Sequence, residues 1–315
     1  MSQVICVGEL LIDFVAKHHS AAIESAENFT KKAGGAPANV ACAVRRLGQK
    51  ALFAGAVGND PMGNFLVHTL EAEDIDVSFM QRTRAFTTLA FVALSDEGER
   101  DFFFSRGADA GLTYDSKLAA QFKDSIVHFG SATAFLEGSL NETYHRYLND
   151  ALSSAKLVSF DPNYRSDLWK VNSDSFVEQC LEFSQKAHLC KFSEEEAYFL
   201  SEQASHEEAA AFFHRLGTRM ICITLGKKGT FLSVDGSACY VESIAAQPVD
   251  TTAAGDAFIG ALLYQFSQQE DPLTCMSDIE IIKEMVRYAN KAGAYTTQSY
   301  GAIEALPYAK DLESL

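Results

Sequence analysis

The chain has 315 residues, 47% of them hydrophobic and 22% charged, which is typical of a globular protein with a substantial core. Its formal net charge is −16, so we expect no nucleic-acid partner and no anionic membrane surface. No apolar run approaches the roughly 18 residues of a membrane span, and no signal-peptide pattern follows Met1. The 7 cysteines show no C-x-x-C spacing, so we expect reduced thiols, no zinc site and a cytoplasmic location.

Short apolar runs that favour strands alternate with helical patterns along the chain. The predicted strands are 3–8, 51–57, 126–130, 157–161, 188–192, 219–225 and 230–234. The predicted helices are 37–47, 61–73, 141–155, 173–186, 194–202, 206–216, 255–268 and 279–296. Apolar strands separated by helices indicate a mainly parallel sheet covered on both faces. We therefore predict a single three-layer α/β/α domain over residues 1–315, with a Rossmann-like architecture.

Two regions interrupt this alternation and are predicted to be β structure without helices. They are 9–17 with 28–33, and 86–110, where a hairpin turns at Asp96–Glu99. Three consecutive phenylalanines, 102–104, are too apolar for an open edge strand. We expect a small β lid that covers a cleft and docks on a second subunit. The alternative is a hairpin buried in the main core.

The segment VDTTAAGDAFIGALLYQF, residues 249–266, combines a helix start with an acid. Small side chains at Ala253, Ala254 and Gly255 leave the N–H groups of the first helical turn uncovered, and such donors attract anionic oxygens. Asp256 follows in the same turn, where it could accept a proton. An anion hole beside a carboxylate base is what phosphoryl transfer to a hydroxyl requires.

A second group of polar residues lies in the N-terminal half. Asp13 ends the first apolar region, Gly34 and Gly35 permit a ligand to approach the backbone, and Asn39 lies in the first turn of a helix. A carboxylate, a bare backbone and an amide suit vicinal hydroxyls, which need several hydrogen bonds. Neither a Walker A motif nor a G-x-G-x-x-G fingerprint is present, which argues against a dinucleotide oxidoreductase.

Read together, these segments resemble the ribokinase-like (PfkB) carbohydrate kinases. The resemblance covers nearly the whole chain and rests on GELLIDF (8–14), GGAPANVACAVRRLG (34–48), VGNDPMG (57–63) and DTTAAGD (250–256). It implies transfer of the ATP γ-phosphate to a sugar. It also implies that Asp256 is the base, that residues 253–255 form the anion hole, and that the sugar contacts are Asp13, Gly34, Gly35 and Asn39. One residue departs from the family pattern, because Ala253 stands where glycine is usual.

Four further segments resemble the fructokinase branch of that family: GERDFFFSRGAD (98–109), HFGS (128–131), FDPNYRSDLW (160–169) and KFSEEE (191–196). The resemblance implies additional sugar contacts at Phe104, Arg106 and Arg165. It implies ATP contacts at Lys191, Ser193, Thr224, Gly226, Gly229 and Asn290. It places Mg²⁺ near Glu196 through water, and a monovalent cation such as K⁺ near Asp250, Thr252 and Ser299.

We therefore expect an ATP-dependent fructokinase that acts as a homodimer joined through the lid. Three other sugar kinases of the family remain open, with aminoimidazole riboside, 2-keto-3-deoxygluconate or ribose as substrate. A sugar-sensing module without activity is a further alternative, although Asp256 and Gly255 are both retained.

Overall fold

The computed structural model describes residues 2–17, 22–94, 100–169 and 172–315. Its strands are β1 (Val4–Val7), β2 (Leu11–Ala16), β3 (Phe29–Gly34), β4 (Ala51–Ala54), β5 (Ala56–Gly58), β6 (Gln81–Thr83), β7 (Leu89–Leu94), β8 (Arg100–Ser105), β9 (Ile126–Gly130), β10 (Leu157–Asp161), β11 (Leu189–Ser193), β12 (Met220–Thr224), β13 (Thr230–Val234) and β14 (Ser237–Val241). Its helices are α1 (Ala36–Arg46), α2 (Pro61–Ala72), α3 (Ser116–Ala119), α4 (Ser139–Ser154), α5 (Ser166–Trp169), α6 (Ser173–Lys186), α7 (Glu194–Ser201), α8 (His206–Leu216), α9 (Ala254–Ser267), α10 (Pro272–Cys275), α11 (Ile279–Thr296) and α12 (Ala309–Glu313).

Eight strands form the central sheet in the order β14-β13-β12-β11-β10-β9-β1-β4. Strands β4, β1, β9, β10, β11 and β12 pair in parallel, while β13 and β14 continue the sheet antiparallel at one edge. The mainly parallel sheet predicted from the alternating pattern is therefore confirmed. Its parallel strands end at a common edge, which is where ligands bind in open α/β sheets.

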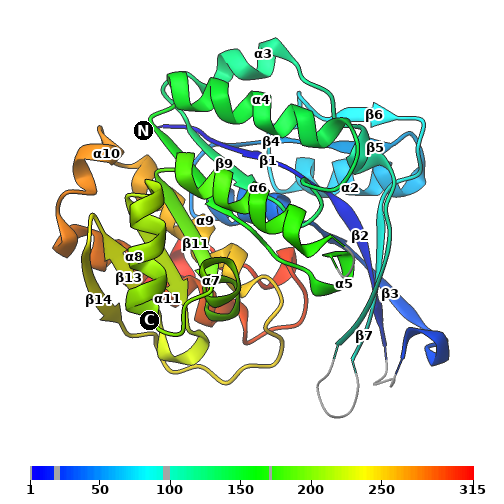
Figure 1. Cartoon of the computed structure of the whole chain (residues 1–315). Helices are drawn as coiled ribbons and strands as arrows, with labels where there is room; N and C mark the ends of the chain where they lie inside the picture. Colours follow the sequence, from blue (N-terminus) through cyan, green and yellow to red (C-terminus); the bar gives the residue numbers. More distant parts are fainter. Residues whose placement is uncertain (1, 18–21, 95–99, 170–171) are drawn as a thin grey trace.

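Helices cover both faces of this sheet (Figure 1). Val4 and Cys6 of β1 face a core shared with α1, α9 and α11, whereas Ile5 and Val7 face a core shared with α4, α6 and α8. This alternation follows from the two-residue repeat of a strand. All seven cysteines are free thiols, and five of them are buried: Cys6, Cys42 and Cys222 in the first core and Cys180 and Cys190 in the second.

The predicted strand 51–57 is wrong as a single element, because it divides at Gly55 into β4 and β5. A methyl group at Gly55 would lie 2.6 Å from the carbonyl oxygen of Gly8, so the chain bends where only glycine fits. Strand β5 then pairs in parallel with β6 in a separate two-stranded sheet. Strand β14 was not predicted, since most of its side chains are exposed and its apolar signal is weak.

A second sheet, of order β3-β2-β7-β8, extends from the α/β body at the lower right of Figure 1. Phe103 of β8 is 58% exposed, so the alternative of a hairpin buried in the main core is wrong. The predicted turn Asp96–Glu99 lies outside the described residues. We call the sheet of β2, β3, β7 and β8 the small sheet.

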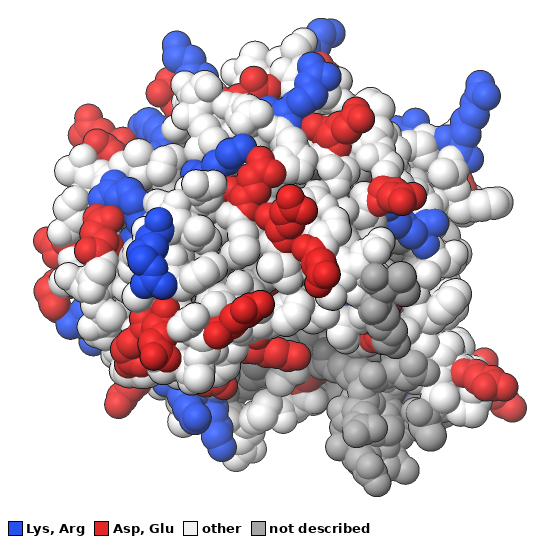
Figure 2. Space-filling view, viewed as in Figure 1, with Lys and Arg blue, Asp and Glu red and all other residues white. Residues whose placement is uncertain are grey.

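No helix in the described part of the chain is long and apolar enough to cross a membrane. On the face shown in Figure 2, acidic side chains alternate with basic ones and no continuous basic area is visible. The net charge of the whole chain is −16.

Candidate active site

Helix α9 begins directly after Ala253, whose φ of 59° lies in the left-handed region. The N–H groups of Gly255 and Asp256 belong to the first turn, where a helix offers no acceptors of its own. These donors and the positive end of the helix dipole attract anionic oxygens. The residues predicted to form an anion hole thus lie at the start of a helix.

Asp256 is 7% exposed and packs against the start of α1. Its Oδ2 accepts a hydrogen bond of 2.8 Å from Nδ2 of Asn39. Burial raises the pKa of the Asp256 carboxyl, while the bond from Asn39 and the charges of Lys191 and Arg165 lower it. A carboxylate with a raised pKa is a better acceptor of a proton at neutral pH. Two helices that are distant in sequence therefore hold a candidate base between them.

Asp13 of β2 lies against the backbone of β3. A methyl group on Gly34 would be 1.9 Å from Oδ2 of Asp13, so only glycine leaves room for this carboxylate. The following residue, Gly35, has a φ of 115° and precedes α1. Burial raises the pKa of Asp13 to about 7, with Arg165 lowering it and Asp256 raising it further. Asp13 therefore lies within electrostatic reach of both Arg165 and Asp256.

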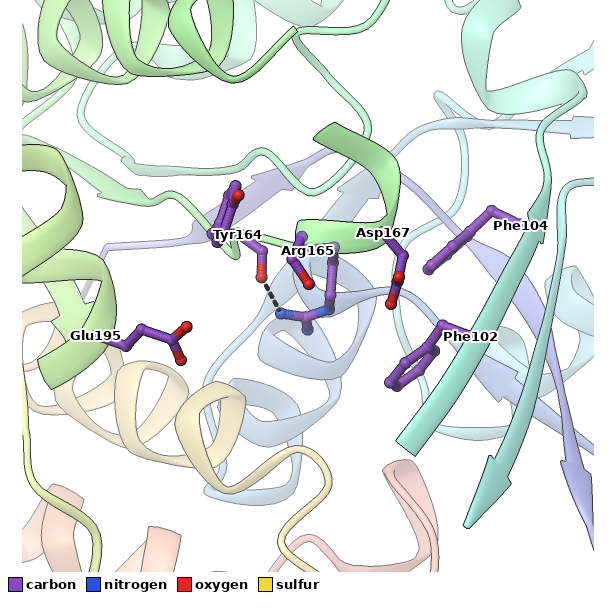
Figure 3. A pocket seen from close by; sticks show the side chains of 7 residues that line it. Phe102, Phe104, Tyr164, Arg165, Asp167 and Glu195 are labelled. Carbon is purple, nitrogen blue, oxygen red and sulfur yellow. Dashed lines mark hydrogen bonds between the residues drawn. The ribbon is translucent and has the colours of Figure 1, made fainter. Parts of the chain in front are cut away.

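A cavity of about 190 Å³ opens between β8 and the starts of α5 and α7 (Figure 3). Phe102 and Phe104 form one wall, with ring centroids 6.2 Å apart. The guanidinium of Arg165 points into the middle of the cavity and donates a hydrogen bond of 3.0 Å to the carbonyl of Tyr164. The remaining lining residues are Ser166, Asp167 and Glu195. The predicted sugar contacts Phe104 and Arg165 thus line one cavity.

Arg106, in contrast, is engaged with the protein itself. Its Nε donates to Oδ2 of Asp109 at 3.2 Å, and its Nη2 donates to the carbonyl of Thr133 at 2.9 Å. A third donor reaches the carbonyl of Glu137. Asp109 is buried and also accepts a hydrogen bond from Thr88. These bonds fasten the base of the small sheet to the α/β body, and a sugar contact by Arg106 stays a prediction.

Lys191, in the middle of β11, lies beside the anion hole. Its Nζ is 3.0 Å from Oδ2 of Asp161, and a methyl group on Gly255 would also lie 3.0 Å from that nitrogen. Burial alone would lower the pKa of Lys191, but the charges of Asp161 and Glu196 raise it. Lys191 therefore keeps its positive charge next to the N–H groups of α9.

Sequence reasoning missed Asp161, although a usable signal was present. The residue is fully buried and ends the apolar strand β10, within the segment FDPN. An acid at the end of a central parallel strand lies at the ligand-binding edge of the sheet. Burial raises the pKa of Asp161, while the charge of Lys191 lowers it.

Glu196 and Ser193 form a capping box at the start of α7. Oε2 of Glu196 accepts from the Ser193 N–H at 2.7 Å, and Oε1 accepts from the Tyr164 N–H at 2.8 Å. The Ser193 hydroxyl in turn accepts from the Glu196 N–H at 3.2 Å. The carboxyl of Glu196 is thus buried and fixed in place, with lone pairs remaining on both oxygens.

The residues predicted to contact ATP lie around the end of β12 and on α11. Thr224 donates to the carbonyl of Phe192, and Gly226 has open space beside its Cα. Gly229 has a φ of 98°, and a methyl group there would meet the Val241 carbonyl at 2.1 Å. On α11, Asn290 accepts from the Thr230 hydroxyl at 2.7 Å and donates to the Val241 carbonyl at 3.0 Å. Asn290 therefore also joins α11 to the antiparallel edge of the sheet.

Asp250 connects the loop before α9 with the loop after α11. Its Oδ1 accepts from the N–H and hydroxyl of Thr252, at 2.9 and 2.6 Å, and its Oδ2 accepts from the Gly301 N–H at 3.2 Å. Ser299 lies in that second loop, two residues before Gly301. The structure thus brings together the two loops predicted to hold a monovalent cation.

A family model decides between the alternatives for this α/β fold. Residues 1–309 match the pfkB family carbohydrate kinase model. The chain belongs to the pfkB family of carbohydrate kinases. The predicted membership and the ribokinase-like fold are both confirmed.

Relatives of this pfkB-family kinase match it over nearly its whole length. Fructokinase-1 of Zea mays is 37% identical over 311 residues, covering 96% of this chain and 94% of the relative. A fructokinase double mutant from Vibrio cholerae O395, solved with fructose, ADP and potassium ion, has a TM-score of 0.87 and 30% identity, with 100% and 98% covered. The ATP-bound fructokinase from Xylella fastidiosa has a TM-score of 0.89 and 30% identity, with 99% and 97% covered.

Proposed function

We propose that this pfkB-family kinase transfers the γ-phosphoryl group of ATP to the 6-hydroxyl of D-fructose and forms fructose 6-phosphate. The observation that carries the proposal is the buried Asp256, bonded to Asn39 and set in the first turn of α9 beside uncovered N–H donors. Similarity to the fructokinases of Zea mays, Vibrio cholerae and Xylella fastidiosa supports fructose as the sugar and ATP as the donor.

Each reacting group has a residue suited to it. Asp13 and Asn39 bind hydroxyls of the sugar, and Asp256 accepts the proton of the 6-hydroxyl while that oxygen attacks the γ-phosphorus. The N–H groups of residues 253–256 stabilise the charge that develops on the transferring group. Lys191, 3.0 Å from Asp161, adds a fixed positive charge beside the same donors.

The small sheet closes over the sugar in this proposal. Phe102 and Phe104 line the cavity that contains Arg165, so closure of β8 would place an apolar wall against the sugar and exclude water. The ATP side of the site consists of Thr224, Gly226, Gly229 and Ser193. Asn290 positions the antiparallel edge of the central sheet, against which the adenine would lie.

The residues near the phosphates suit a magnesium ion held through water. Among the described residues, no group of three or more His, Cys, Asp or Glu side chains could hold a metal directly. Glu196 is fixed by two backbone N–H groups and retains lone pairs, and Mg²⁺ commonly keeps several waters. When bound with ATP, the ion neutralises charge on the β- and γ-phosphates.

A monovalent cation suits the junction of loops at Asp250. The proposed ligands are oxygens of the Asp250 carboxylate and the Thr252 carbonyl, which are hard ligands. A hydrogen bond from the Thr252 N–H to Asp250 orders this segment directly before the anion hole. A bound K⁺ would keep the loop at Ala253 in one conformation. Ser299 is the proposed contributor from the second loop.

The active form in this proposal is a homodimer joined through the small sheet. Its outer face carries Phe14, Phe29, Phe91 and Phe103, with Phe91 contacting the other three at centroid distances of 5.2 to 6.3 Å. Phe103 is 58% exposed and the other three rings are half-buried, and a partly exposed aromatic cluster of this kind suits protein association. The cytoplasmic location stays a prediction from the sequence.

The proposal is tested by an ADP-release assay with fructose, ribose, 2-keto-3-deoxygluconate and aminoimidazole riboside, with and without K⁺. We expect the highest kcat/KM with fructose. The variant Asp256→Asn should keep the fold and the affinity for sugar but lose at least ~10² in kcat, the usual contribution of a positioned base. Faster turnover of another sugar would refute fructose as the substrate, and near-normal turnover by the variant would exclude Asp256 as the base.

A further inference from the structure

Glu9 lies at the turn between β1 and β2, where the α/β body continues into the small sheet. It is 1% exposed. A methyl group on Gly35 would lie 2.4 Å from the carbonyl oxygen of Glu9, and one on the preceding Gly8 would lie 2.4 Å from Cγ of Pro37. The backbone on both sides of the residue is therefore tightly packed, and the side chain stays inside the protein.

Both carboxyl oxygens of Glu9 are buried, and apart from the backbone N–H of Glu9 itself they have no hydrogen-bond partner among the described residues. A buried carboxyl without a partner is destabilising, and an apolar side chain of similar size would cost less free energy at this position. Buried polar groups in native proteins are nearly always satisfied, so an unsatisfied pair of acceptors calls for an explanation. A ligand with hydrogen-bond donors would satisfy these oxygens and so explain their burial.

Glu9 borders the candidate active site, because its carbonyl oxygen packs against Gly35 at the start of α1, the helix that holds Asn39. Asp256 and Arg165, which face the reacting hydroxyl and the cavity, both influence its ionisation, as does the buried Asp109. Burial is the largest cause and raises the pKa of Glu9 to about 8. A large share of the molecules at neutral pH therefore carries Glu9 as a neutral acid, which both donates and accepts a hydrogen bond.

We propose that Glu9 is an additional sugar-binding residue, whose carboxyl group hydrogen-bonds to a hydroxyl of the bound sugar. The assignment rests on the proposed function, because it requires a polyhydroxylated substrate. A hydroxyl supplies the missing donor without adding charge to a region that already holds Asp13, Asp109 and Asp256. An anionic phosphate would be repelled there, and the described residues include no cluster fit for a metal ion.

The test compares Glu9→Met with Glu9→Gln. Methionine fills a similar volume without oxygen atoms, whereas glutamine keeps one acceptor and supplies donors. We expect Glu9→Met to raise the KM for the sugar at least tenfold, with kcat and the KM for ATP within about threefold of the wild type. Glu9→Gln should raise the KM for sugar by a smaller factor. The matched control is Ser184→Ala, which removes another buried unpartnered oxygen, on α6 away from the site, and should change no kinetic constant.

Deoxy sugars identify the hydroxyl concerned. The sugar that lacks it should bind the wild type more weakly but lose little more affinity in Glu9→Met, because the pair no longer exists. A folded Glu9→Met enzyme whose KM for sugar stays within twofold of the wild type would overturn the inference. If the wild type phosphorylates no sugar of the panel, the proposed function fails instead, so the two failures are distinguishable.

Discussion

Ala253 adopts a backbone conformation that its side chain disfavours. Its φ of 59° is in the left-handed region, where a residue with a Cβ atom is strained by about 1–2 kcal/mol relative to the right-handed region. Glycine, the usual residue of the family at this position, adopts the same φ freely. The chain therefore holds its anion hole in place despite local strain, with Asp250 and Thr252 bonded just before it.

Ala253→Gly should consequently stabilise the free enzyme by about 1 kcal/mol, since relief of strain outweighs the extra freedom of glycine in the unfolded chain. Urea denaturation measures the change. Ala254→Gly is the matched control, because position 254 is helical and glycine there should destabilise by about 0.5–1 kcal/mol. Equal destabilisation by both substitutions would mean that the left-handed conformation at 253 stores no strain.

The sequence predicted which residues belong to the site better than it predicted their contacts. The contact between Asn39 and Asp256 was predictable as a shared role, because both lie in first turns of helices, but not as a hydrogen bond of 2.8 Å. The pair of Lys191 and Asp161 joins two strands, and a single sequence carries no record of which residues face each other across a sheet. Glu9 has apolar neighbours in the sequence, but its nearly complete burial could not be predicted from that position.

At the scale of elements, the small sheet has two different aromatic faces. Phe102 and Phe104 line the cavity, whereas Phe103 points to the opposite face because side chains alternate along a strand. The three consecutive phenylalanines thus serve two surfaces. One faces the proposed sugar site, and the other continues the cluster around Phe91.

Phe103→Glu should therefore weaken the proposed dimer without affecting the fold of the α/β body. Phe103 is 58% exposed, and burying a charge in an apolar interface is strongly unfavourable. Light scattering after size exclusion should show dimers for the wild type and monomers for the variant. Ile281→Glu, at an exposed position of α11, is the control and should leave the mass unchanged. A wild type that is monomeric at micromolar concentration would refute the dimer.

Separate apolar runs and long amphipathic helices were predictable because their sequence patterns are strong, and the bounds of β9, β10, α6 and α11 agree with the sequence prediction. Elements whose limits depend on contacts with distant residues were not predictable. β4 and β5 form one apolar run, and the bend at Gly55 depends on the approach of Gly8, which directly follows β1. β14 is half exposed and is defined by its pairing with β13.

At the scale of the whole molecule, several buried groups titrate abnormally. Burial raises the pKa of Glu9 to about 8 and that of Asp13 to about 7, so the folded state binds protons that the unfolded state has released. Burial acts oppositely on His128, lowering its pKa to about 3, and also lowers the pKa of His188. The histidines decrease stability below about pH 6.5, and the two acids decrease it as the pH rises toward 8.

Stability should therefore fall by about 1 kcal/mol between pH 7 and pH 8, where the unfolded histidines are already neutral and Glu9 is losing its proton. Urea denaturation without ligands at the two pH values measures the change. Glu9→Gln should abolish most of it, because the amide does not titrate. A decline of the same size in that variant would assign the pH dependence to other groups.

The distribution of the thiols has a consequence for following the unfolding of this chain. Cys239 and Cys275 are partly exposed, whereas the other five are divided between the two sides of the central sheet. A thiol reagent reaches each buried group only when the helices on that side separate from the strands. The modification rates of the two groups of cysteines therefore report on the two layers of helices separately. They show whether the layers detach together or in succession.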